Sequence, residues 1–66
     1  MDIGEIRSVL VSQYNDSEEV AKNLRGLGAG KYRRAVKQVR KDIEELDNIM
    51  ARNFGMAFNP ELKIYE

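Results

Sequence analysis

The chain of 66 residues contains no cysteine and no histidine. Their absence excludes disulfides, thiol catalysis, iron–sulfur clusters, histidine general bases and almost every structural zinc site, so no cofactor or metal is expected. No apolar run approaches the roughly 18 residues that a bilayer crossing needs, and no membrane partner is therefore expected. The first residues are acidic and do not follow the basic-then-apolar order of a signal peptide, which favours a cytoplasmic protein.

The chain is also short, and its size predicts a single small helical domain over residues 1–66. Apolar residues make up 42% and charged residues 33% of it, which indicates a folded globular chain rather than a disordered one. A domain of this size buries only about 60% of the surface that its unfolded chain exposes. Small domains compensate with disulfides, a metal or a partner, and the composition leaves the partner.

Apolar residues at helical spacing predict a first helix over about residues 3–25. These residues are Ile3, Ile6, Leu10, Tyr14, Ala21 and Leu24. Asp2 and Glu5 have the spacing of a capping box at its start. The stripe keeps its phase across Asn15, Asp16 and Ser17, which favours one helix, straight or kinked near Ser17, while two shorter helices are the alternative.

Three glycines within residues 26–30 predict a tight turn after this helix. The next apolar residues alternate by four and three and predict a second helix over about residues 31–53, with Gly55 just beyond it as a natural C-cap. They are Tyr32, Val36, Val39, Ile43, Leu46 and Met50. Two helices of similar length with a short link form an antiparallel hairpin, so the predicted fold class is all-α.

The last residues, 54–66, have a different pattern. Apolar side chains alternate with small or polar ones on both sides of Pro60, which indicates an extended tail with one apolar side. A tail that folds back over the open end of the hairpin is the favoured interpretation. An exposed recognition strand or dimer-swapped arm is the second, and a disordered tail is the third.

No catalytic arrangement is found, and an enzyme is not expected. The segment from Gly26 to Lys31 lacks the glycine and the Ser or Thr that a phosphate-binding loop requires, because Arg25 and Tyr32 stand at those positions. Acid–base catalysis needs carboxyl groups in unlike environments within a cleft. The paired carboxylates are instead expected on solvated helix surface; they are Glu18 with Glu19, Glu44 with Glu45, and Asp42 with Asp47.

Charge is strongly segregated although the net charge is zero. Residues 20–41 contain eight basic residues and no acidic one. The eleven acidic residues elsewhere are accompanied by only three basic ones, which leaves a net charge of −8. In a hairpin this places the positive charge at the turn and the negative charge toward the open end. Cross-hairpin pairing of Arg33 or Arg34 with Glu18 or Glu19 is one explanation, and a patch for an acidic partner is another.

These observations favour a non-enzymatic protein–protein interaction module, such as a small adaptor, inhibitor or assembly factor. Its partner is expected to be another protein with an acidic surface, and a homodimeric bundle is also considered. The candidate interface residues are Val11, Ile49, Phe54 and Phe58. The alternative is a nucleic-acid-binding module that contacts phosphates through residues 22–41. Its candidate residues are Arg25, Lys31, Arg33, Arg34, Lys37 and Arg40.

Overall fold

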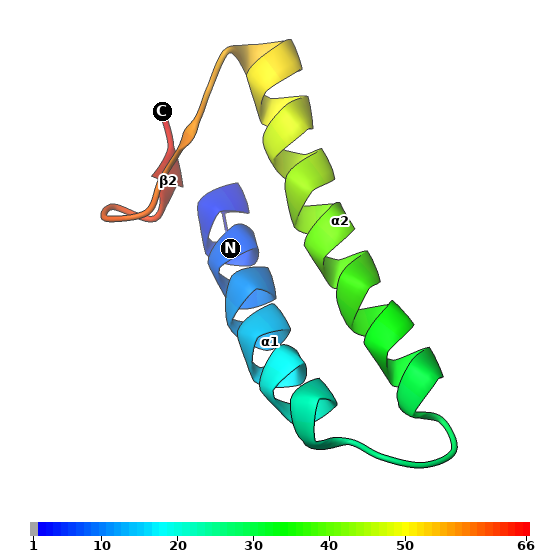
Figure 1. Cartoon of the computed structure of the whole chain (residues 1–66). Coiled ribbons are helices and arrows are strands. Elements are labelled where there is room, and N and C mark those ends of the chain that lie inside the picture. The colour runs from blue at the N-terminus through cyan, green and yellow to red at the C-terminus, as the bar shows by residue number, and fades with distance from the viewer. Residues whose placement is uncertain (1) are drawn as a thin grey trace.

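The computed structural model describes residues 2–66 as two antiparallel helices joined by a glycine-rich bend (Figure 1). Helix α1 spans Ile3–Asn23 and helix α2 spans Ala29–Phe54. Strands β1 (Phe58–Asn59) and β2 (Ile64–Tyr65) form a small antiparallel sheet in the C-terminal tail. The predicted fold class, an all-α hairpin with a short extended tail, is confirmed.

Helix α1 begins where its capping residue predicts. The side-chain carboxylate of Asp2 accepts a hydrogen bond of 2.8 Å from the backbone N–H of Glu5. The helix then runs without interruption through residues 15–17, so the alternative of two shorter helices is wrong. Those residues include no proline or glycine, and they continue the same helical phase. The helix ends at Asn23, two residues before the predicted end, because Leu24 is already extended.

Helix α2 begins at Ala29, two residues earlier than predicted, because only part of the glycine cluster is used for the turn. Gly26 and Gly28 have positive φ angles of 93° and 89°, whereas Gly30 lies inside the helix. The carbonyl of Gly28 already accepts a 3.0 Å bond from the N–H of Tyr32. At the other end the left-handed Gly55 (φ 62°) terminates the helix, as predicted.

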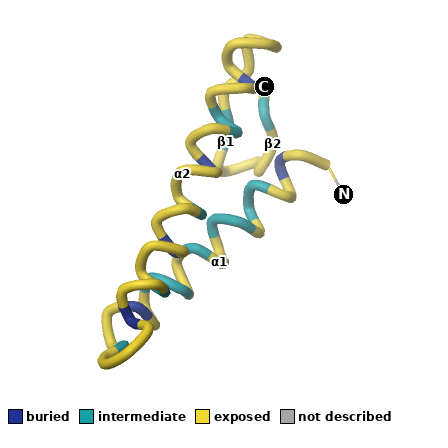
Figure 2. Tube along the Cα trace, turned by 90° about the vertical axis from the view of Figure 1, so that its right-hand side faces the viewer, coloured by how far each residue is buried: buried dark blue, intermediate teal, exposed yellow. Residues whose placement is uncertain are grey.

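The core is a single row of side chains along the inner side of α2. Ala29, Val36, Ile43 and Met50 are buried and recur at every seventh residue, as in a coiled-coil seam. Ala21 is their buried apolar counterpart in α1. Figure 2 shows these buried positions as isolated segments in two helices that are otherwise half-buried or exposed. Within residues 2–66 no side chain falls below 2% exposure. The hairpin therefore has a thin core.

The C-terminal tail, residues 55–66, folds back to the N-terminal end of α1, as the favoured interpretation predicts (Figure 1). Its two ends are joined because Ala57 and Glu66 exchange two backbone hydrogen bonds of 3.0 and 2.9 Å. The backbone of Lys63 passes directly over Gly4, where a Cβ atom would overlap the Lys63 carbonyl oxygen. The absence of a side chain at this position of α1 permits the close approach.

Candidate protein-interaction surface

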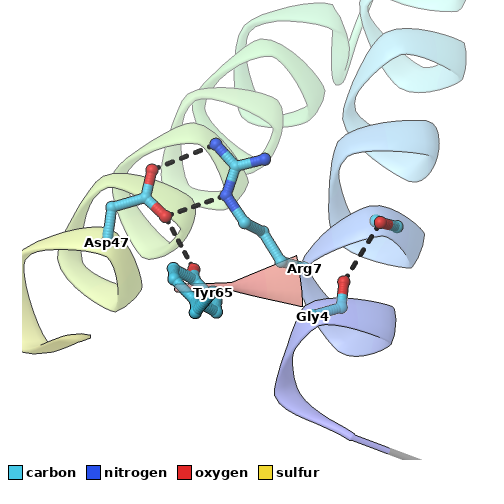
Figure 3. Close-up of polar contacts among 5 residues, drawn as sticks. Gly4, Arg7, Asp47 and Tyr65 are labelled. Atoms are coloured by element: carbon cyan, nitrogen blue, oxygen red, sulfur yellow. Dashed lines mark hydrogen bonds and ion pairs between the residues drawn. The ribbon is translucent and has the colours of Figure 1, made fainter. Parts of the chain in front are cut away.

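One face of the hairpin is closed by a polar cluster that joins α1, α2 and the tail (Figure 3). The Arg7 guanidinium donates two hydrogen bonds to the Asp47 carboxylate, Nε to Oδ1 at 2.8 Å and a terminal nitrogen to Oδ2 at 3.0 Å. The Tyr65 hydroxyl donates a third bond of 2.6 Å to the same carboxylate. The Asp47 side chain remains 39% exposed, but it is bonded to Arg7 and Tyr65 rather than free on the surface. No local pattern indicates its partner Arg7, which lies 40 residues away in the sequence.

Aromatic contacts extend this cluster along the tail. The Arg7 guanidinium carbon lies 4.1 Å from the centre of the Phe58 ring, a cation–π contact. The Phe58 and Tyr65 rings meet edge to face with centroids 5.2 Å apart. Phe58 and Val11 both line a groove of about 320 Å³ between α1 and the tail. Two of the four candidate interface residues, Val11 and Phe58, thus face each other's segments across this groove within the chain.

The electrostatics of the cluster are those of a structural contact. Hydrogen bonding from Arg7 lowers the pKa of Asp47, and the same bond raises the pKa of Arg7. Burial, followed by the hydrogen bond to Asp47, raises the pKa of Tyr65 to about 12. Tyr65 therefore remains protonated at neutral pH and acts as a hydrogen-bond donor. The cluster holds the tail in place.

The opposite face of the hairpin carries apolar side chains with no tail above them. In α1, the 100° helical step places Ile6 and Val20 about 140–180° from Val11 and Asn15, which line the groove beneath the tail. In α2, Leu46 lies about 100° from Asp47, which accepts the hydrogen bond from Tyr65 of the tail. We define this apolar surface as the open face; it comprises Ile6, Leu10, Val20, Leu24, Val39, Leu46 and Ile49.

The apolar side chains of the open face are largely exposed to solvent or only half-buried. Val20 is 50% exposed, Ile6 41% and Ile49 39%, and the other four residues are half-buried. Ile49 is the candidate interface residue that lies here, whereas Phe54 lies at the end of α2 and is 63% exposed. The structure therefore distributes the four candidate interface residues over the groove, the open face and the helix end.

Several cations at the bend remain without partners. Arg33 is the exception, because its guanidinium donates to the carbonyls of Ala21 (3.3 and 3.4 Å) and Leu24 (2.9 Å) and so caps the end of α1. Arg40 lies 3.4 Å from Glu44 in an exposed pair within α2. We define the basic bend as the exposed cations of residues 25–37 whose side chains form no ion pair or hydrogen bond within residues 2–66; they are Arg25, Lys31, Arg34 and Lys37.

The bend residues do not pair across the hairpin as one explanation of the charge pattern expects. Glu18 pairs with Lys22 in its own helix at 3.9 Å, and Arg33 bonds to backbone carbonyls instead of a carboxylate. The exposed apolar side chain of Leu27 lies between the cations at the turn. Arg33 acts as a helix cap because α1 ends before the predicted residue 25, which brings its last carbonyls within reach.

In the described part of the chain, residues 2–66, three or more metal-ligating side chains do not gather at any point. Neither helix combines the length and the apolar character that crossing a membrane requires, as far as residues 2–66 are concerned. Comparisons with protein-family models, with curated proteins and with solved structures find no match to this chain. The open face and the basic bend are the surfaces of residues 2–66 that remain available to a partner.

Proposed function

We propose that this chain is a non-enzymatic protein–protein interaction module that binds its partner through the open face. The observation that carries the proposal is the exposure of Ile6, Val20 and Ile49 on a single side of a thin hairpin. Apolar side chains gathered on one face of a small domain mark an interaction site, whereas scattered ones do not. Covering this face would complete the core that a two-helix hairpin lacks.

The surface area supports a binding role. A compact chain of 7.6 kDa would expose about 4,300 Å². The chain exposes 5168 Å², which is roughly 900 Å² more. Its extents of 43 × 21 × 17 Å account for the excess, because the molecule is long and only two helices wide. A partner in a typical stable interface contributes about 800 Å², so the excess is of the size that one such interface would cover.

The basic bend gives the proposed interaction its charge preference. Arg25, Lys31 and Arg34 are exposed near one end of the hairpin, so an acidic surface would be attracted to that end. The same unpaired cations favour nucleic-acid binding as a second candidate function. The zero net charge weighs against it, because the acidic open end would repel a long polyanion.

Affinity capture from lysate of the source cells, with and without nuclease, tests the proposal. The immobilised full chain is compared with Val20→Glu, which alters the open face, and with Arg34→Glu, which alters the basic bend. Leu62→Glu is the matched control, because Leu62 is 61% exposed and lies in the tail. We expect nuclease-resistant capture of protein that Val20→Glu abolishes and Leu62→Glu preserves. Nuclease-sensitive capture that Arg34→Glu abolishes would contradict the proposal and favour nucleic acid.

A further inference from the structure

The pattern of the open face, together with the charge layout, identifies one partner that fits it. We propose that the open face is covered by the open face of a second copy of this chain, packed antiparallel, to give a two-fold symmetric four-helix bundle. This inference rests on the proposed function and names the partner. The spacing of the apolar residues, the charges at the two ends and the exposed area support it.

Contacts between α1 and α2 show which residues of the two helices lie at the same level, and this determines where a two-fold axis would cross the hairpin. The Arg7–Asp47 bond and the Ala21–Arg33 bond both join residues whose numbers add up to 54. Residue 15 of α1 therefore lies level with Val39 of α2, near the middle of the hairpin. A two-fold axis across the helices at this level would place each residue opposite its mirror position in the second copy.

Four apolar residues of α1 that belong to the open face are spaced symmetrically about that level. Ile6 and Leu24 lie nine residues to either side of position 15, and Leu10 and Val20 lie five to either side. The intervening polar positions, Gln13 and Ser17, are two residues to either side. An isologous interface requires a self-complementary surface, in which each group meets its counterpart. On the open face apolar positions would meet apolar ones and polar positions would meet polar ones.

The α2 part of the open face agrees with the same axis. Val39 lies at the level of the axis and would face the Val39 of the second copy. Leu46 lies seven residues to one side of it, and Tyr32, which is half-buried next to the open face, lies seven residues to the other side. The row formed by these three residues is the outer row of the coiled-coil seam, whose inner row is already buried against α1. The second copy would bury the outer row.

Charge selects the antiparallel orientation over the parallel one. Residues 20–41 carry eight positive charges at the bend end, and the rest of the chain carries a net charge of −8. A parallel pair would place two basic bends side by side, where their charges repel. An antiparallel pair places each basic bend beside the other copy's open end, with acidic residues that include Asp2, Glu5 and Glu45. Because the net charge of the chain is zero, the positive charge of residues 20–41 in one copy is equal to the net negative charge of the remaining residues in the other.

The area also fits a second copy. Each chain exposes roughly 900 Å² more than a compact chain of its mass would. A standard interface takes about 800 Å² from each partner. Two hairpins joined along their open faces would form a four-helix bundle, two helices thick and two wide, around a continuous core.

Sedimentation equilibrium of the full chain measures the association. We expect twice the chain mass of 7.6 kDa at tens of micromolar for the wild type and for Leu62→Glu. Val20→Glu should raise the dissociation constant by about 100-fold or more, because each copy would bury a carboxylate among apolar groups. Val20 is half exposed in the single chain, so the variant should keep its helical circular dichroism. A wild type of single-chain mass up to millimolar concentration would overturn the proposal.

Engineered cysteines test the orientation, since the chain has none of its own. Val39→Cys should form a disulfide-linked dimer on mild oxidation, because the two residues meet at the axis. Leu24→Cys should cross-link with Ile6→Cys in a mixture but not with itself. In the antiparallel pair two Leu24 positions lie about 27 Å apart along the bundle, whereas a disulfide needs Cα atoms within about 7 Å. Efficient self-cross-linking of Leu24→Cys would overturn the antiparallel arrangement.

The outcomes separate this inference from the proposed function. If the wild-type chain is monomeric but Val20→Glu still abolishes capture of a lysate protein, the homodimer is wrong and the proposal of an interaction module is supported. A wild type that stays single and captures no protein through the open face would overturn both. If Val20→Glu lost its helical signal, Ile6→Lys, at a position 41% exposed, would take its place in the same measurement.

Discussion

The close approach of the tail to Gly4 gives a prediction whose sign depends on the structure. Gly4→Ala places a Cβ atom where it overlaps the Lys63 carbonyl oxygen, and the Cα of Ile64 would lie only 3.1 Å from the same Cβ. Both neighbours are backbone atoms, so they cannot move aside by changing a rotamer. The tail must therefore shift away from α1, and the bond between Tyr65 and Asp47 is lost or weakened with it.

Two opposing effects determine the magnitude. Replacing glycine by alanine within a helix stabilises it by about 0.5–1 kcal/mol. A hydrogen bond to a charged group contributes roughly 1.5–3 kcal/mol, and the cation–π contact of Phe58 with Arg7 of α1 adds about 0.5–1 kcal/mol. The tail contacts outweigh the helix gain, so we expect Gly4→Ala to lower the free energy of unfolding by about 1–3 kcal/mol.

Gly30→Ala is the matched control for this prediction. Gly4 and Gly30 are both the second residue of their helix, but a Cβ atom at Gly30 would meet only the Arg34 side chain at 3.9 Å. This variant should therefore raise the stability by up to about 1 kcal/mol. Urea unfolding followed by circular dichroism measures both changes. Equal stabilisation by the two substitutions, with the tail still resistant to proteolysis in Gly4→Ala, would refute the packing described for the tail.

Three further predictions concern the polar contacts. The pKa of Asp47 is lowered in the folded chain, so its ionised carboxylate stabilises the fold above about pH 4, and this stabilisation is lost as the pH falls through the pKa of the folded state. Asp47→Asn should therefore reduce the loss of unfolding free energy at acid pH. The pKa of Tyr65 is raised in the folded chain, so the stabilisation from its neutral hydroxyl is lost as the pH rises from about 10 to 12. Tyr65→Phe should remove the increase in tyrosinate absorbance near pH 12. Arg33→Met should cost about 1 kcal/mol in urea unfolding because it uncaps α1, whereas Arg34→Met should change stability by less than about 0.5 kcal/mol; equal effects would contradict the capping role.

The regular part of this fold could be predicted from the sequence because its signals are local. The row of Val36, Ile43 and Met50 is a seven-residue repeat, and the left-handed Gly55 ends its helix as expected. The helix through residues 15–17 was the ambiguous point. The apolar residues on both sides of it keep one helical phase, and the helix is continuous there. The polar side chains of residues 15–17 compete only weakly with helical hydrogen bonds when no proline or glycine accompanies them.

The contacts of the site depend on pairs that are distant in sequence. Nothing in the local pattern joins Arg7 to Asp47 or Tyr65, because their proximity follows from the helix register and the path of the tail. One signal was available: Gly4 weakens the first turn of a strong helix, and such a residue indicates a close backbone approach. The role of Arg33 as a helix cap was hidden by its place within a run of cations.

The central claim is that the apolar residues of the open face become part of a buried core when a second copy of the chain packs against them. The dependence of thermal unfolding on protein concentration tests it most directly, because only an associating chain gains stability by mass action. Over a 100-fold increase from about 10 µM to 1 mM, we expect the midpoint to rise by about 5–10 °C for the wild type and to stay constant for Val20→Glu. A wild-type midpoint that is constant within about 1 °C over this range would contradict the claim.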